Sequence, residues 1–188
     1  LPYYEKGIVF LKQSDYSNAV INFTKAIDLN PYKDSYKNSV VSVAQRIANE
    51  ASMLAKRQDF NQAIPKYKDA IKYYPEFTEA IFNLAKIFYR LEDFDNAKSY
   101  LIKNLSVDDN QPQSLKMIAD IYKKERNTSE AIKYYNLAVK AYPDYYQAYY
   151  SLGTLLIRTD LSSSKEMLIK ATNIRDDYYK AHETLGIV

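Results

Sequence analysis

The feature that most constrains this chain is a short pattern of small, aromatic and proline residues that returns along its length. The pattern reads Ala-x3-aromatic-x2-Ala-x4-Pro, and its full copies begin at Ala19, Ala63 and Ala131. A degenerate copy begins at Ala97, where Leu, Asn and Asp replace the aromatic residue, the second Ala and the Pro. The steps from Ala63 to Ala97 and from Ala97 to Ala131 are both 34 residues. A constant step of this length indicates a stack of similar helical units, because a generic helical bundle has no reason to keep it.

A second small residue stands twelve positions before the first Ala of each copy, between large apolar residues. Two later glycines continue the series, so that these positions hold Gly7, Ala51, Ala85, Ala119, Gly153 and Gly186. Small side chains at these places would let two antiparallel helices approach closely, while large neighbours fill the space that remains. The chain is therefore predicted to be all-α, with two helices in each unit.

The period and the positions of these residues resemble the tetratricopeptide repeat (TPR) family over nearly the whole chain. The resemblance implies a right-handed α-solenoid of helix-turn-helix TPR repeats, with about five full repeats and a partial sixth. We expect one array over residues 1–188, with repeats at about 1–33, 34–77, 78–111, 112–145 and 146–178 and a partial repeat at 179–188. Because the chain starts without Met and stops inside a helix pair, we expect the parent protein to continue beyond it.

The step from the first copy to the second is 44 residues, ten more than the period. The added segment, residues 34–43, contains no Pro or Gly. Tyr36 and Val43 continue the apolar stripe of the following helix backward at helical spacing. The pattern predicts one long helix from about Lys33 to Lys56, and a looped insertion is the alternative.

Polar residues mark where the second helix of each repeat should begin. Asp15, Asp59 and Asp93 stand at these places and are suited to accept hydrogen bonds from the free amides of a helix N-terminus. Asn127 and Ser163 are each followed three residues later by Glu, which is the spacing of a capping box. We expect both to cap the second helices of the fourth and fifth repeats.

Residues that could support catalysis are scarce. The chain has no Cys and one His, His182, which excludes thiolate chemistry, disulfides and cysteine-bound zinc. Its three Gly leave no phosphate-binding loop or dinucleotide fingerprint. The acidic pairs Asp108-Asp109 and Asp176-Asp177 fall at repeat junctions, where helix N-caps are expected. We therefore expect a protein that is not an enzyme and has no catalytic residue, metal or cofactor.

Composition narrows the partner and the compartment only in part. The formal net charge of +3 is much weaker than the basic bias of most nucleic-acid-binding domains, so we do not expect nucleic acid as the partner. No apolar run is long enough to cross a bilayer. The compartment stays open between cytoplasm and periplasm, and the abundance of Lys, Asn, Ile and Tyr favours an AT-rich, bacterial source.

The family resemblance implies that the first helix of each repeat lines a concave groove through fixed positions of the repeat. Carried over residue by residue, these positions place the candidate peptide-binding residues at Tyr4, Asn49, Lys56, Phe82, Asn83, Lys86, Tyr89, Arg90, Lys116, Lys123, Tyr150 and Arg158. The acids at the same positions are Glu79 and Asp120, so cations are in excess. A groove focuses such an excess of positive charge, and the interspersed aromatic residues are typical recognition anchors.

These residues predict an extended acidic peptide bound at repeats two to four. Asn49 and Asn83 share a position in adjacent repeats, which resembles the asparagine ladder with which some TPR superhelices hold a peptide backbone. The carboxylate clamp of chaperone-binding TPR proteins is absent, because Tyr4 and Ile8 stand where its first Lys and Asn would be. A solvated helix face that happens to carry lysines is the alternative.

Three functions stay open at this point. The leading one is a protein–protein interaction scaffold that binds a partner protein or peptide. The second is an interaction or regulatory arm of a larger enzyme or membrane-associated assembly. The third is RNA binding through the basic groove, although the chain lacks the regularly placed side chains with which helical-repeat proteins read bases. Self-association through the ends of the array is compatible with any of them.

Overall fold

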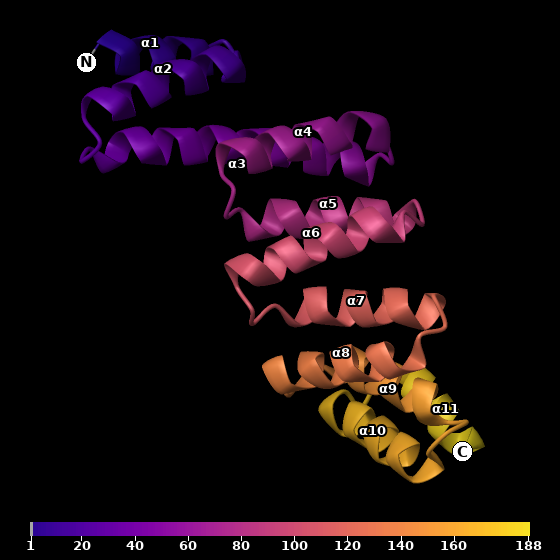
Figure 1. The fold of residues 1–188 in the computed structure, drawn as a ribbon. Helices are drawn as coiled ribbons and strands as arrows, with labels where there is room; N and C mark the ends of the chain where they lie inside the picture. Colours follow the sequence, from indigo (N-terminus) through magenta and orange to yellow (C-terminus); the bar gives the residue numbers. More distant parts are fainter. Residues whose placement is uncertain (1) are drawn as a thin grey trace. The chain divides into compact units, whose positions relative to one another are not determined.

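The computed structural model describes residues 2–188 and contains eleven α-helices and no strand over that range (Figure 1). In chain order they are α1 (Pro2–Lys12), α2 (Tyr16–Leu29), α3 (Asp34–Lys56), α4 (Phe60–Tyr73), α5 (Thr78–Arg90), α6 (Phe94–Val107), α7 (Pro112–Lys124), α8 (Thr128–Ala141), α9 (Tyr146–Leu156), α10 (Leu161–Ile174) and α11 (Tyr179–Ile187). The expected all-α fold is confirmed, with five helix pairs in chain order followed by a single helix. None of these helices is both long and apolar enough to cross a membrane.

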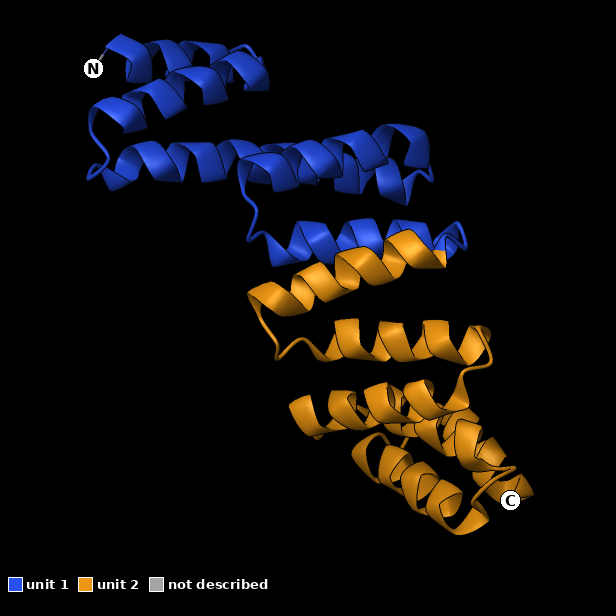
Figure 2. Ribbon diagram, viewed as in Figure 1, with its two compact units in different colours: residues 1–93 blue, residues 94–188 orange. Residues whose placement is uncertain are grey.

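The helices group into two compact units, unit 1 (residues 1–93) and unit 2 (residues 94–188), shown in Figure 2. In unit 1, α1 packs on α2, α2 on α3, and α4 on both α3 and α5. In unit 2, each helix from α6 to α11 packs on the next. Neighbours in the sequence are thus neighbours in space, as in stacked helical repeats. The boundary between the units falls between α5 and α6, inside the predicted third repeat.

Small residues in the first helix of a pair make room for one large aromatic residue of the second. Phe23, Tyr67 and Tyr135 come from second helices, and each is at most 2% exposed. Gly7 of α1 lies so close to Phe23 that a Cβ at residue 7 would be 2.6 Å from two ring carbons. The absence of a side chain at this position is therefore what lets α1 and α2 pack at their observed distance.

The ten additional residues of the second repeat are helical. They belong to α3, which is 23 residues long and extends past α4 in Figure 1. Tyr36, Val43 and Ile47 are buried along its length. The ring centroid of Tyr36 lies 4.7 Å from that of Tyr4 in α1, and α3 also packs on α2. The long helix is confirmed and the looped insertion is wrong, because the apolar stripe of the added segment packs against the first helix pair.

Three of the five predicted helix caps are confirmed, and the one at Asp93, directly before α6, stays a prediction. The side chains of Asp15, Asp59 and Asn127 accept hydrogen bonds from the backbone amides three residues later, at the starts of α2, α4 and α8. Ser163 is not a cap, because α10 begins before it and Asp160 accepts from both its amide and its hydroxyl. The fifth repeat is one residue short, and the helix begins earlier than the Ser-x-x-Glu spacing indicated.

The acidic pairs are not helix N-caps. Asp108 accepts hydrogen bonds from the amide of Asn110 and the side chain of Gln111 in the turn after α6. Asp177 forms an ion pair with Arg175 at 2.8 Å in the turn after α10. The helices that follow, α7 and α11, have no side-chain cap. These carboxylates stabilise the turns between helix pairs instead of the helix ends.

Four residues in the left-handed backbone region follow the first helices of their pairs. Ser14, Gln58, Glu92 and Arg126 have φ values of 60° to 64°, and the last three are spaced by the 34-residue period. A side chain in this region costs about 1–2 kcal/mol, so each of these turns carries some strain. The turn between α9 and α10, in the repeat that is one residue short, has no residue with positive φ.

Candidate functional site

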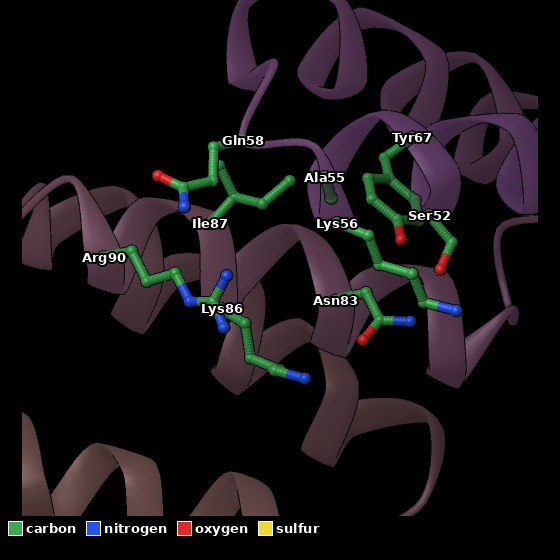
Figure 3. Close-up of a pocket in the computed structure, with 9 residues that line it drawn as sticks. All are labelled: Ser52, Ala55, Lys56, Gln58, Tyr67, Asn83, Lys86, Ile87 and Arg90. Atoms are coloured by element: carbon green, nitrogen blue, oxygen red, sulfur yellow. The ribbon is translucent and has the colours of Figure 1, made fainter.

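Unit 1 contains a pocket of about 420 Å³ where the end of α3 meets α4 and α5 (Figure 3). We refer to it as the α3–α5 pocket, and its lining consists of Ser52, Ala55, Lys56, Gln58, Tyr67, Asn83, Lys86, Ile87 and Arg90. Four of the predicted groove residues, namely Lys56, Asn83, Lys86 and Arg90, belong to this set. The structure therefore brings together candidate residues from two predicted repeats.

Helical spacing explains why α5 supplies three of the four predicted groove residues that line the pocket. Asn83, Lys86 and Arg90 are three and four positions apart, so their side chains leave the same face of the helix. Lys56 joins them from the last turn of α3, a helix that contacts α5 directly. Tyr89, also predicted in the groove, is half-buried on α5 and does not line the pocket.

Tyr67 reaches the pocket from α4, between the two first helices. Its side chain is 2% exposed, and Figure 3 shows its hydroxyl beside Ser52. Burial raises the pKa of the Tyr67 hydroxyl, a hydrogen bond with Ser52 lowers it, and the carboxylate of Glu79 raises it again. The net shift is upward, so the hydroxyl is protonated at neutral pH and available as a donor.

The cations of the pocket have no acidic partner. Over residues 2–188, no ion pair or hydrogen bond joins the side chains of Lys56, Lys86 or Arg90 to another residue. The Lys86 ammonium lies 5.8 Å from the centre of the Phe82 ring, which is a cation–π contact. Glu79 is close enough to affect the pKa of Tyr67. Three positive charges and this one negative charge leave the region with a net charge of about +2.

Three other predicted residues of unit 1, Tyr4, Asn49 and Phe82, do not line the pocket. Tyr4 is half-buried, with its ring centroid 5.6 Å from that of Phe23 and 4.7 Å from that of Tyr36, so it packs within the first helices. Asn49 is exposed on α3, whereas Asn83 lines the pocket. The structure does not bring the two asparagines into one pocket, and the ladder stays a prediction about a bound peptide.

In unit 2 the predicted lysines are engaged within the chain. The ammonium of Lys116 lies 2.8 Å from a carboxylate oxygen of Asp120. The same carboxylate accepts a hydrogen bond of 2.6 Å from the hydroxyl of Tyr135. Lys123 donates to the hydroxyl of Thr154 at 3.4 Å. The ion pair cancels much of the positive charge that the sequence placed at Lys116.

Unit 2 has a tyrosine-rich pocket of about 620 Å³ that sequence reasoning missed. Its lining consists of Pro112, Gln113, Tyr142, Asp144, Tyr145, Tyr146, Gln147, Ile174 and Arg175. Burial raises the pKa of Tyr145 to about 12, and Arg175 donates to the hydroxyl of Tyr146 at 2.6 Å. Most of these residues lie at helix ends and turns, but Gln113 and Gln147 stand 34 and 68 residues after Glu79 and thus at the same groove position of the repeat. The high Tyr content of the chain, 20 residues, was the signal that could have indicated it.

The other candidate positions do not gather into a site. Tyr150 packs edge-on against Tyr178, with ring centroids 5.2 Å apart, and Arg158 is exposed after α9. His182 is exposed, and its ring nitrogen lies 2.8 Å from the backbone oxygen of Asp176. In the described part of the chain, no three His, Cys, Asp or Glu side chains are placed to hold a metal ion.

Family models described as tetratricopeptide repeat match much of the chain. One matches residues 54–121, and another matches residues 2–33 and 113–145. Human RANBP2-like and GRIP domain-containing protein 1 is 26% identical over 84 residues, which are 45% of this chain and 5% of that protein. The chain thus corresponds to a small part of the length of the curated relatives that it matches.

Solved structures share the fold across most of the chain. The structure of YrrB, described as a TPR protein with an unusual peptide-binding site, has a TM-score of 0.60 and 17% identity, covering 98% of this chain and 90% of that one. The first TPR of Spaghetti (RPAP3), bound to the HSP90 peptide SRMEEVD, has a TM-score of 0.55 and 18% identity, covering 58% and 88%. At these identities the likeness concerns the fold alone.

Proposed function

The chain belongs to the tetratricopeptide repeat family, whose members generally mediate protein–protein interactions, and we propose that it is a scaffold that binds an acidic segment of a partner protein. TPR folds are generally non-enzymatic, and the proposed role requires no catalysis. The proposed binding site is the α3–α5 pocket. The observation that carries the proposal is its three cations without an acidic partner.

Charge complementarity favours an acidic ligand. Acidic side chains of a partner would supply the counter-charge that Lys56, Lys86 and Arg90 lack within the chain. Hydrogen bonds to charged groups contribute about 1.5–3 kcal/mol each, so two or three of them could supply much of a micromolar affinity. The Asn83 amide can both donate to and accept from a peptide group, which would hold the backbone of the ligand next to the cations.

Two structural neighbours support a peptide as the ligand. YrrB is described as having a peptide-binding site, and the RPAP3 repeat is bound to the peptide SRMEEVD, which carries acidic residues. Since the clamp residues of chaperone-binding TPR proteins are missing here, we propose a different placement of the ligand, centred on α5.

A second candidate role is that of an interaction arm within a larger protein. The observation that favours it is the 5% of the first curated relative's length to which this chain corresponds. The two roles are compatible, because an arm of this kind would still recognise its partner through a surface such as the α3–α5 pocket. The sequence of the full-length gene tests the second role.

The scaffold proposal is tested by affinity capture from a lysate of the source organism, followed by mass spectrometry. The bait is the unaltered chain beside the triple variant Asn83→Ala, Lys86→Ala, Arg90→Ala. We expect a protein that the unaltered chain retains and the variant loses.

A matched control removes the same three residue types elsewhere in unit 1, by Lys37→Ala, Asn38→Ala and Arg46→Ala. These residues are exposed on α3 and lie outside the pocket. We expect this control to retain the partner, and circular dichroism should show that both variants stay helical. Equal recovery by all three baits would overturn the proposed site.

A further inference from the structure

We propose that the group recognised by the α3–α5 pocket is a phosphoryl group on a side chain of the partner. This inference rests on the proposed function, and it names the ligand chemistry within the acidic segment. The ligand would be a phosphorylated peptide rather than one that carries only Glu and Asp.

The first argument is charge. The pocket cations Lys56, Lys86 and Arg90, together with the nearby Glu79, carry a net charge of about +2. A phosphorylated side chain carries about −1.5 to −2 at neutral pH, whereas a carboxylate carries −1. One phosphoryl group would therefore balance the region, and one carboxylate would leave a positive charge unmatched.

The second argument is the number of donors. Besides the three cations, the Asn83 amide lines the same pocket, and the Tyr67 hydroxyl, which is hydrogen-bonded to Ser52, adds one further donor. A phosphoryl group presents three terminal oxygens that are strong acceptors, against two in a carboxylate. The planar guanidinium of an arginine such as Arg90 is suited to bidentate contact with a phosphoryl group.

The third argument is space. The volume of about 420 Å³ is large enough for a phosphorylated side chain together with some of its flanking backbone. Ala55 of α3 helps to create it, because the same repeat position holds the larger Tyr89, Lys123 and Ile157 in the next three repeats. Tyr67 closes the inner side of the pocket with a protonated hydroxyl.

The corresponding surface of unit 2 carries an acidic residue and is not suited to bind an anion. The repeat position of Lys86 holds Asp120 there, whose carboxylate pairs with Lys116 at 2.8 Å. A phosphoryl group at that place would meet a negative charge instead of a cation. The difference makes the α3–α5 pocket, among the predicted groove positions, the place suited to a phosphoryl group.

The test is an NMR titration of the full chain, isotopically labelled, with acetyl-Gly-phosphoSer-Gly-amide, with acetyl-Gly-Glu-Gly-amide and with inorganic phosphate. We expect the phosphopeptide to shift the Asn83 side-chain amide and the Arg90 Nε–H signals saturably, with roughly ten-fold tighter binding than the Glu peptide. The shift of the Asn83 signal should vanish in Lys86→Ala, Arg90→Ala, and both shifts should persist in the control Lys37→Ala, Arg46→Ala. Equal affinity for the two peptides, or shifts retained in the pocket variant, would overturn the inference. Inorganic phosphate binding as tightly as the phosphopeptide would also overturn it, since the site would then recognise a free anion.

Phosphatase treatment of the lysate separates this inference from the proposed function. A partner that depends on Asn83, Lys86 and Arg90 but is still captured after dephosphorylation would sustain the scaffold and overturn the phosphoryl inference. A partner indifferent to those residues would overturn the proposed site, while phosphopeptide shifts at Arg90 would still support a phosphoryl pocket. Loss of capture on dephosphorylation, together with dependence on the pocket, would support both.

Discussion

Tyr67 in unit 1 and Tyr135 in unit 2 occupy the same place in their helix pairs, 68 residues apart, yet their hydroxyls meet different groups. Both rings are at most 2% exposed. The Tyr67 hydroxyl faces the α3–α5 pocket beside Ser52 (Figure 3). The Tyr135 hydroxyl donates to Asp120, which stands 68 residues after Ser52 and thus at the same repeat position.

This one position decides whether neighbouring cations are neutralised within the chain. Asp120 accepts from Tyr135 and pairs with Lys116, and the side chains of this ion pair are only 19% and 25% exposed. Ser52 carries no charge, so the cations of the pocket around it keep theirs. Both units thus bury a tyrosine at the same repeat position, but the surface beside it carries an internal ion pair in unit 2 and cations without an acidic partner in unit 1.

The largest expected effect comes from moving the acid into unit 1 by Ser52→Asp. A carboxylate within about 5–8 Å of a bound phosphoryl group, whose charge is about −1.5 to −2, costs about 3–7 kcal/mol at an effective dielectric constant near 20. Binding of the phosphoserine peptide should weaken by roughly 100-fold or more, as measured by NMR titration. Ser52→Asn, which adds a similar volume without charge, should change it by less than about three-fold. Undiminished binding to Ser52→Asp would show that Ser52 does not govern the pocket.

The second prediction concerns a buried pair that differs between the units. In unit 2 the Asn104 amide donates to the Ser114 hydroxyl at 2.9 Å, both residues are 0% exposed, and the Asn104 side-chain oxygen has no partner. Unit 1 holds Ala70 and Ala80 at the same two repeat positions. Ser114→Ala should lower the free energy of unfolding by about 1–3 kcal/mol, because it leaves a buried amide unpaired.

The double variant Asn104→Ala, Ser114→Ala is the control for that prediction. It installs the alanine pair of unit 1 and removes both polar groups, so its stability should stay within about 0.5 kcal/mol of the unaltered chain or exceed it. Urea denaturation followed by circular dichroism measures both variants. A double variant less stable than Ser114→Ala alone would contradict the explanation, since the cavity would then outweigh the polar groups.

The third prediction compares the two tyrosine hydroxyls directly. Tyr135→Phe removes a hydrogen bond to a charged carboxylate and should lower the free energy of unfolding by about 1–2 kcal/mol. Tyr67→Phe should lower it by less than about 1 kcal/mol, since its hydroxyl faces the pocket and a neutral Ser52. The Tyr67→Phe variant should instead bind the phosphoserine peptide more weakly. If thermal melts showed equal decreases in the melting temperature of the two variants, the proposed difference between the two hydroxyls would be contradicted.

The smallest effect is expected at the left-handed turns. Arg126 of unit 2 has φ 61°, a conformation that glycine adopts without steric cost. Arg126→Gly should raise the free energy of unfolding by about 0.5–1 kcal/mol, and Ser14→Gly should act similarly in unit 1. Thr159→Gly serves as the control, because its turn has no positive φ and glycine there only adds flexibility. A thermal melt in which Arg126→Gly and Thr159→Gly shift the midpoint in the same direction would contradict this account.

The sequence by itself determined the helices and their pairing. The 34-residue step and the alternation of small and large residues reflect contacts between successive helices, which are local in the sequence and repeat with it. The stripe through Tyr36 and Val43 was enough to predict the extension of α3. The cap at Ser163 was predicted wrongly because its Ser-x-x-Glu spacing lies inside the helix, whereas Asp160 stands four residues before Ser164, as Asn127 stands four before Ala131, and accepts from the helix start.

Only the tertiary structure decided which candidate residues form a pocket and which are neutralised. The groove positions of the repeat predicted that Lys56, Asn83, Lys86 and Arg90 share a face. They did not predict the pocket beside these residues or that the Tyr67 hydroxyl lines it. The four-residue spacing of Lys116 and Asp120 was a local signal of an ion pair, whereas the hydrogen bond from Tyr135 joins two helices. Helical periodicity is a property of neighbouring residues, but the availability of a charge depends on distances between side chains from different helices.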